Sequence, residues 1–339
     1  MGRDKTQYHR DLHQQAYDKF QKMQAFGESK VAAVKDETER KKIFSFNTYQ
    51  TYWKHTKYFL KWVQVNHPEV TRLNQAKEFV SDWLQSRVDQ GLSAWTIHTE
   101  EAALNKLYGI MPDDENRFIA PQRKRENIKR SRIKTVRDSH FSETNNDELV
   151  RFCKGTGLRR RELENLKGAD FITRKSIEKT ICSLENLERE LTPTEEKMLI
   201  AMKDTRVFEE ENFVIVRYGK GGRLRYSPII GKDCDAIVER IKRTQGDKKV
   251  WDFVNGNADI HGYRAVYATE IYRKHAREIA KIPYDKMNPG TGKMYQGDVY
   301  VCRNDESGRK LDRAAMLICS KALGHNRVRV VADNYLRGL

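Results

Sequence analysis

Residues 212–230, NFVIVRYGKGGRLRYSPII, decide the fold of the second half of the chain. Apolar and polar side chains alternate on both sides of a Gly-Lys-Gly-Gly turn. This alternation is typical of two antiparallel strands that bury one face, and the glycines suit the turn between them. The stretch therefore predicts a β-hairpin with Lys220 at its tip.

Helical patterns flank this hairpin, so residues 141–339 are predicted to form a mixed α/β domain with a small antiparallel sheet. Residues 141–155 predict a helix capped by Ser142, and TGLRRRELENL (156–166) predicts a short second helix. Further helices are expected in a charged insert at 174–206 and over 258–281, 311–325 and 328–336, with a loop and hairpin at 288–310.

The first half of the chain is densely helical. Residues 1–42 are expected to form a charged helical extension, and residues 43–114 an all-α domain of about four helices. One helix is predicted to stop at Gly91, and the next to begin at the N-cap Ser93 and to bury Ile97, Leu104 and Leu107. The predicted fold class is therefore α+β, with an all-α domain, a linker at 115–140 and the mixed domain.

The formal net charge of +16 favours association with a polyanion, although a lysine-rich surface on a soluble protein is the simple alternative. Residues 115–138 carry nine lysines and arginines against three acidic residues, whereas residues 185–211 carry nine acidic residues against four basic ones. This segregation is expected when one surface faces phosphate. The predicted DNA contacts are Arg123, Lys124, Arg125, Lys129, Arg130 and Arg132 in the linker, with Thr96 and His98 in the helical domain.

Several classes of protein are excluded by what the sequence lacks. No stretch is apolar enough to cross a membrane, and the first residues lack the apolar core of a signal peptide. The five cysteines form no CxxC pair, which argues against zinc sites and disulfides and favours a cytoplasmic setting. The glycine-rich pieces GKGGR and NPGTGKM lack P-loop spacing, so no nucleotide cofactor is expected, and no HExxH arrangement supports a metal site.

Four short motifs carry more information together than apart. They are TGLRRREL with Arg159 and Glu162, the hairpin turn with Lys220, HGYR with His261 and Arg264, and LGHNRVRVVADNY with His325 and Tyr335. Each alone has an ordinary reading, since an arginine near a glutamate is usually a surface pair and a hairpin lysine is usually solvated.

In this order, the four motifs resemble the tyrosine recombinase (phage-type integrase) family, most closely the integrases of bacterial mobile elements. The resemblance covers residues 141–339, and the helical domain at 43–114 is similar to the family's DNA-binding core-binding domain. His325 and Tyr335 stand one position further apart than is usual in the family.

The resemblance implies that Tyr335 is a nucleophile that forms a 3′-phosphotyrosine, without ATP or metal. It also implies that Arg159 and Arg264 clamp the phosphate oxygens, because a guanidinium fork matches phosphate geometry. His325 would bind the phosphate, as would His261, which is favoured to accept the phenolic proton.

Two further roles follow from the resemblance. Lys220 would be the general acid, and Glu162 would orient its neighbours, with a simple intrahelical ion pair as the alternative for Glu162. The implied partners are double-stranded DNA and three more copies of the chain, in a homotetramer on two duplexes. A type IB-like topoisomerase and an inactive DNA-binding regulator remain the alternative functions.

Overall fold

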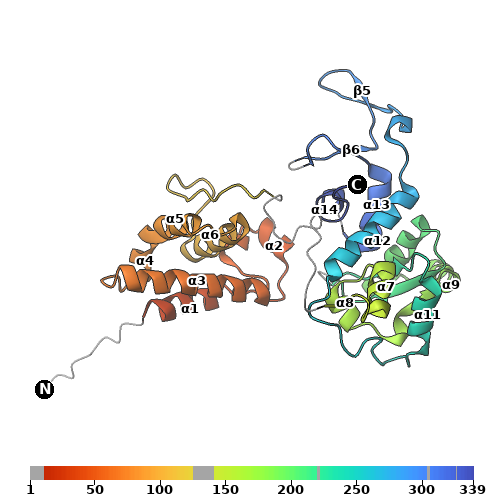
Figure 1. Ribbon diagram of the computed structural model, residues 1–339, viewed down its shortest axis with the longest axis horizontal. Coiled ribbons are helices and arrows are strands. Elements are labelled where there is room, and N and C mark those ends of the chain that lie inside the picture. The colour runs from red at the N-terminus through yellow and green to blue at the C-terminus, as the bar shows by residue number, and fades with distance from the viewer. Residues whose placement is uncertain (1–10, 125–140, 220–221, 304–305, 326) are drawn as a thin grey trace. The chain divides into compact units, whose positions relative to one another are not determined.

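A computed structural model describes residues 11–124, 141–219, 222–303, 306–325 and 327–339 of the chain. The chain forms two compact units, Met1–Ile128 and Lys129–Leu339, which we call unit 1 and unit 2 (Figure 1). The described residues combine many helices with three small antiparallel sheets, so the fold class is α+β. No helix within these described ranges combines the length and the apolar character needed to cross a membrane.

The regular elements of unit 1 are all helices in its described residues. As predicted, Ser93 caps a helix by accepting a hydrogen bond from the backbone N–H of Thr96, and the preceding helix ends beside Gly91. Ile97, Leu104 and Leu107 are buried. The helices are α1 (Leu12–Lys22), α2 (Lys30–Lys35), α3 (Phe46–Asn66), α4 (Leu73–Ala76), α5 (Val80–Asp89) and α6 (Ala94–Tyr108), with short 3₁₀ helices η1 (Glu39–Lys41) and η2 (Lys77–Phe79).

The first helix shares the core of unit 1. Leu12, Ala16 and Phe20 recur every four residues, so they lie on one face of α1. This face packs in the same hydrophobic cluster as Phe59 and Leu60 of α3. Part of the segment predicted as an extension at 1–42 is therefore built into the helical unit.

Unit 2 surrounds a three-stranded antiparallel sheet in the order β1-β2-β3, with two separate strand pairs. Its elements are α7 (Asp147–Thr156), α8 (Arg160–Glu164), η4 (Gly168–Asp170), β1 (Phe171–Thr173), α9 (Arg174–Glu185), α10 (Pro193–Lys203), η5 (Asp204–Val207), β2 (Asn212–Val216), β3 (Arg225–Pro228), α11 (Cys234–Arg243), α12 (Ile260–His275), η6 (Ile279–Lys281), β4 (Lys286–Met287), β5 (Met294–Tyr295), β6 (Val299–Val301), β7 (Lys310–Asp312), α13 (Arg313–Leu323) and α14 (Val328–Asn334).

The predicted hairpin is confirmed, since β2 pairs antiparallel with β3 and Val216 lies opposite Arg225. Successive residues of β2 enter different clusters, as the period of two in a strand requires. Phe213 packs in the cluster that includes residues of α12 and α13, whereas Val214 packs with residues of α7, α8 and α11. The sheet, which includes the hairpin motif, therefore packs against the helices that carry the other three motifs.

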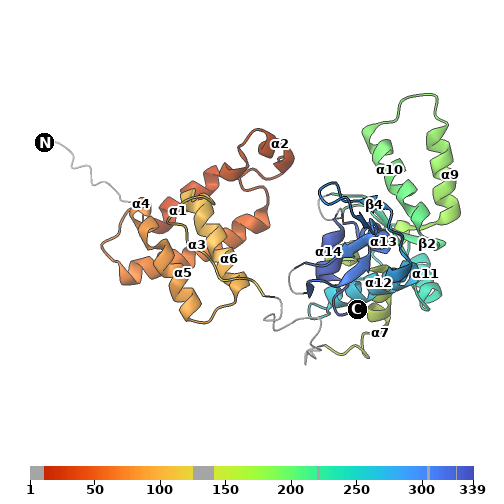
Figure 2. The ribbon, with the colours of Figure 1, turned by 90° about the horizontal axis from the view of Figure 1, so that it is seen from above.

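Two predicted helix boundaries are wrong. α7 begins at Asp147, and Ser142 instead accepts a hydrogen bond from the backbone N–H of Asn145 in the preceding turn. α12 ends at His275, because Arg277 donates from its backbone N–H and its side chain to the buried carboxylate of Asp312. The predicted helical insert at 174–206 is confirmed as α9 and α10, which project from unit 2 in Figure 2.

Candidate active site

Two glycines in the motifs allow the chain to turn sharply at the site. Gly157 of TGLR has φ +59° and follows α7, and a Cβ there would lie 2.3 Å from the ring of Tyr267. Gly324 of LGH has φ +67° and follows α13, and a Cβ there would lie 2.6 Å from Cδ of Arg225. Because both positions combine left-handed backbone with close approach, only glycine fits without strain.

These turns bring Arg159 and Glu162 against the end of α13. Arg159 precedes α8, and its backbone N–H and Nη1 donate to the carboxylate of Glu162 at 2.8 and 2.6 Å. Its Nη2 donates to the carbonyl of Leu323 at 3.2 Å. The predicted placement of Arg159 at a helix start, one turn before Glu162, is confirmed.

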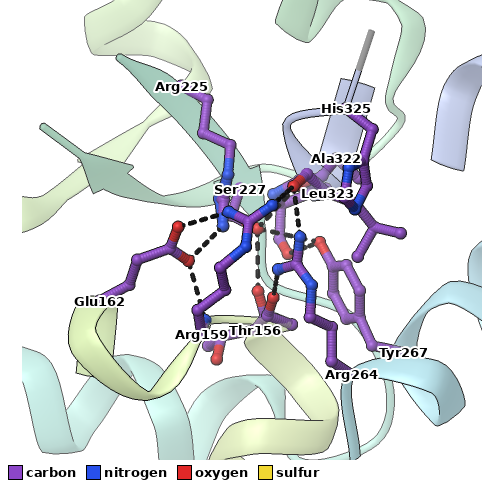
Figure 3. Close-up of polar contacts among 12 residues, drawn as sticks. Thr156, Arg159, Glu162, Arg225, Ser227, Arg264, Tyr267, Ala322, Leu323 and His325 are labelled. Carbon is purple, nitrogen blue, oxygen red and sulfur yellow. Dashed lines mark hydrogen bonds and ion pairs between the residues drawn. The ribbon is translucent and has the colours of Figure 1, made fainter. Parts of the chain in front are cut away.

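Glu162 is buried and accepts hydrogen bonds from two arginines (Figure 3). Arg225 of β3 donates from Nη2 to its carboxylate at 2.6 Å, in addition to the contacts from Arg159. Burial opposes ionisation of Glu162, but the charges of Arg225 and Arg159 outweigh it and lower the pKa of Glu162 to about 2. Glu162 is therefore a permanent anion at neutral pH.

Arg225 is a site residue that the sequence motifs did not reveal. Its side chain is 6% exposed, and its Nε and Nη1 atoms are buried with no hydrogen-bond partner among the described residues. Burial lowers the pKa of Arg225, although Glu162 opposes that shift. The available signal was an arginine inside a strand predicted to be half buried, but alternation alone gives Arg223 and Arg225 the same face.

Arg264, the phosphate clamp predicted from HGYR, is 1% exposed. Its Nη1 and Nη2 donate to the carbonyls of Gly157 and Leu323, so the ends of the two glycine turns hold it in place. Its Nε donates to the hydroxyl of Tyr335 at 3.2 Å. Burial, and then the nearby charge of Arg225, lowers the pKa of Arg264 to about 10.

Tyr335 follows α14 and points inward, with 6% of its surface exposed. Its hydroxyl lies 3.3 Å from Nε2 of His325 and within hydrogen-bond distance of Arg264. The ring of His261 packs edge-on against the tyrosine ring, with the centroids 5.2 Å apart. The phenol oxygen therefore lies between a guanidinium and an imidazole, and a second imidazole adjoins the ring.

A pocket of about 270 Å³ opens beside these groups. Arg159, His261 and Arg264 line it together, although they come from the start of α8 and from α12. His261 and Arg264 project together because residues three apart share a face of a helix, as predicted. The lining contains three arginines and one carboxylate, that of Asp259, so the pocket suits a ligand with anionic oxygens.

The structure brings together six of the seven residues predicted from the motifs: Arg159, Glu162, His261, Arg264, His325 and Tyr335. The seventh, Lys220, lies outside the described residues. Its neighbour Gly219 lies beside the site, since a Cβ there would be 3.7 Å from the Glu162 carboxylate. The described part of the hairpin turn therefore adjoins Glu162.

Only four of the eight predicted DNA contacts lie within the described residues. Arg125, Lys129, Arg130 and Arg132 lie outside the described residues, and Arg123 and Lys124 are exposed. Thr96 and His98 are half-buried and already engaged within unit 1. The hydroxyl of Thr96 lies 2.9 Å from that of Ser93, and Nε2 of His98 lies 3.0 Å from the carbonyl of Pro121.

In the described ranges, no cluster of three or more histidine, cysteine, aspartate or glutamate side chains could hold a metal ion. The donor set of the site is instead rich in arginine, which binds anions rather than metals.

Comparison with known proteins leaves the family open. No protein-family model matches the chain, and no curated protein matches it. Solved structures similar to the chain include a crystal structure of the XerA recombinase, with 14% sequence identity over 94% of this chain and 92% of that chain. The TM-score is 0.26, which is too low to establish a shared fold.

Proposed function

We propose that the protein is an enzyme that cuts and rejoins DNA strands through a covalent phosphotyrosine at Tyr335, as a tyrosine-type site-specific recombinase. The observation that carries this proposal is the position of the Tyr335 hydroxyl, within 3.3 Å of both Arg264 Nε and His325 Nε2. A phenol is a poor nucleophile at neutral pH unless its proton is removed and the charge that develops nearby is stabilised.

The charge balance of the site supports a phosphate ligand. Arg159, Arg225 and Arg264 place three guanidiniums around the carboxylate of Glu162. Even with its pKa lowered to about 10, Arg264 keeps its proton at neutral pH. The excess positive charge in a mostly buried site would be compensated by a phosphodiester, whose negative charge grows in the transition state.

The proposed reaction is a transfer of one phosphodiester bond from the DNA to Tyr335 and back. The Tyr335 oxygen bonds to phosphorus as the bond from phosphorus to the 5′-oxygen breaks, and the phenolic proton passes to a histidine. Lys220 would protonate the leaving 5′-oxygen. Attack by another 5′-hydroxyl then reverses the step and joins new strands. The phosphotyrosine retains the bond energy, so the proposed step calls for neither ATP nor a metal.

His325 is better placed than His261 to accept the phenolic proton. The resemblance favours His261 for this role, but Nε2 of His325 lies within hydrogen-bond distance of the phenol oxygen, at 3.3 Å. His261 lines the pocket with Arg159 and Arg264, and this position suits a phosphate contact. We therefore assign proton acceptance to His325 and phosphate binding to His261.

The finer parts of the proposal rest on the sequence. The substrate would be double-stranded DNA at two recombination sites, bound by unit 1 and by the basic linker that includes Arg123 and Lys124. Four copies of the chain would assemble on two duplexes in the cytoplasm, in the manner of a mobile-element integrase. A type IB-like topoisomerase would use the same chemistry without joining two sites, and a regulator would bind DNA without cutting it.

Covalent trapping tests the proposal. The protein is incubated with nicked duplexes that carry random-sequence inserts, which release a short strand on cleavage, and adducts are detected on denaturing gels and sequenced. We expect adducts with the wild type and with the control Tyr295→Phe, whose tyrosine is exposed on β5, but none with Tyr335→Phe. An adduct with Tyr335→Phe would overturn the assignment of the nucleophile.

The same experiment separates the alternatives. Relaxation of a supercoiled plasmid with no joined products would favour a topoisomerase. DNA binding without any adduct from the wild type would favour a regulator, and the proposed function would then be wrong.

A further inference from the structure

The arginine that follows Arg159 has a separate set of contacts. The guanidinium of Arg160 donates hydrogen bonds to four backbone carbonyls of one short segment, residues 254–258. Its Nη1 reaches the carbonyls of Val254 and Asn255 at 3.3 and 2.8 Å, and its Nη2 reaches those of Gly256 and Ala258 at 3.1 and 2.8 Å.

This segment leads directly into α12, which carries His261 and Arg264 at the pocket. Asp259 caps α12 by accepting a hydrogen bond from the backbone N–H of Gly262 at 2.8 Å. His261 lies in the first turn of α12, three residues after the last carbonyl that Arg160 contacts. A shift of the segment would therefore move His261 first, and Arg264, one turn further along, less.

Arg159 and Arg160 have different neighbours because Arg159 precedes α8 with extended backbone, whereas Arg160 is the first residue of the helix. Arg159 contacts Glu162 and the carbonyl of Leu323, whereas Arg160 contacts residues 254–258. Arg160 also lines the pocket, but its two terminal nitrogens are already committed to backbone carbonyls. The two adjacent arginines therefore act in different ways.

We propose that Arg160 is a positioning residue that fixes His261 in the pocket through residues 254–258. This inference rests on the proposed function for its catalytic consequence, but not for its structural part. Arginine suits the task because its planar fork presents several donors in a fixed geometry, whereas lysine presents a single flexible ammonium. The segment between α11 and α12 forms no strand or helix among the described residues. The carbonyls of Asn255 and Ala258 also accept local backbone hydrogen bonds, and Arg160 ties all four carbonyls to the start of α8.

Hydrogen exchange tests the structural part without any reaction. The variants are Arg160→Gln and Arg160→Lys, with Arg161→Gln as the matched control because Arg161 is exposed on the same helix. We expect the amides of residues 256–262 to exchange faster in Arg160→Gln, by about tenfold or more if two or more hydrogen bonds are lost. Arg161→Gln should match the wild type, and Arg160→Lys should fall between. Unchanged exchange in Arg160→Gln would overturn the proposal.

A double-mutant cycle tests the catalytic part. At saturating DNA, Arg160→Gln should lower the rate of adduct formation by about 10- to 100-fold with little change in DNA affinity, because small displacements of a positioned group have costs of that size. If Arg160 acts through His261, the double variant with His261→Ala should be no slower than His261→Ala alone. Additive losses would overturn a role through His261.

The two parts fail in different ways. If the wild type forms no adduct, the proposed function is wrong, and the exchange experiment still decides whether Arg160 holds the segment. If the wild type forms adducts and Arg160→Gln is as fast, Arg160 is not a positioning residue for this reaction.

Discussion

Glu100 in unit 1 and Glu162 in unit 2 are both buried carboxylates that contact arginine side chains. Arg87 donates to Glu100 from Nε and Nη2 at 3.1 and 3.2 Å, and Nδ1 of His55 lies 3.3 Å away. Burial opposes ionisation in each case, but the neighbouring donors and charges lower the pKa of both carboxyl groups. Both clusters thus follow the rule that a buried charge is paired.

The two clusters differ in their charge balance. Among the described contacts, Glu100 has a single arginine partner, whose guanidinium also stacks on the ring of Trp83 at 4.8 Å. Glu162 lies among three arginines, and one of them contacts a tyrosine hydroxyl. In the first cluster one arginine balances one carboxylate. The second cluster carries an excess of positive charge that a bound anion would compensate. Charge imbalance, and not burial alone, therefore distinguishes the candidate active site from the cluster in unit 1.

The largest expected effect comes from removing one arginine from each cluster, because one change should affect the rate of adduct formation and the other the stability. Arg159→Gln should slow adduct formation by about 10³-fold, because it removes a donor to the phosphate in the transition state. Arg87→Gln should leave that rate within about threefold, although it removes a partner of the buried Glu100 and lowers stability by about 3 kcal/mol. Both rates are measured at a temperature at which circular dichroism shows both variants folded. Equal losses of rate in the two variants would show that the two clusters do not differ in function.

Acidification should lower the free energy of unfolding through protonation of Glu162. Its pKa lies near 2 in the folded protein and at 4.5 ordinarily, so its contribution to stability is complete above pH 4.5 and is lost as the pH falls toward 2. Between pH 7 and pH 3 this group alone should cost about 2 kcal/mol of unfolding free energy.

Urea denaturation at the two pH values, followed by near-ultraviolet circular dichroism, measures this loss. Glu162→Gln should be less stable at pH 7 because Arg225 loses its partner, and it should show a smaller loss on acidification. Glu164→Gln is the control, since Glu164 is on the same short helix. A Glu162→Gln variant with the full acid loss would show that other groups are responsible.

The smallest expected effect is that of a free anion. Inorganic phosphate at ten times its dissociation constant should stabilise unit 2, which holds the cluster around Glu162, by about 1.4 kcal/mol. Hydrogen exchange should then slow at residues 157–164 and 260–265 but not in α5 and α6, when phosphate replaces chloride at equal ionic strength. Slowing in both units would indicate a general salt effect and remove the distinction between the clusters.

Local rules account for the parts of the fold that the sequence predicted. The hairpin follows from alternation around Gly-Lys-Gly-Gly, and the start of α6 follows from the hydroxyl of Ser93 as a helix cap. The two errors had different causes, one local and one distant. Ser142 caps a turn instead of α7, and α12 stops early because Arg277 binds Asp312, far along the chain.

The sequence by itself determined which residue types the site contains and in what order, because each motif sets its own local geometry. It placed Arg159 one turn before Glu162, and His261 on the same helix face as Arg264. Only the tertiary structure decided that Arg225 is the second partner of Glu162, that Arg160 holds the segment before α12, and that His325 is hydrogen-bonded to Tyr335. These contacts join residues distant in the sequence. Periodicity and capping carry no information about them, because burial and pairing depend on which elements the folded core packs together.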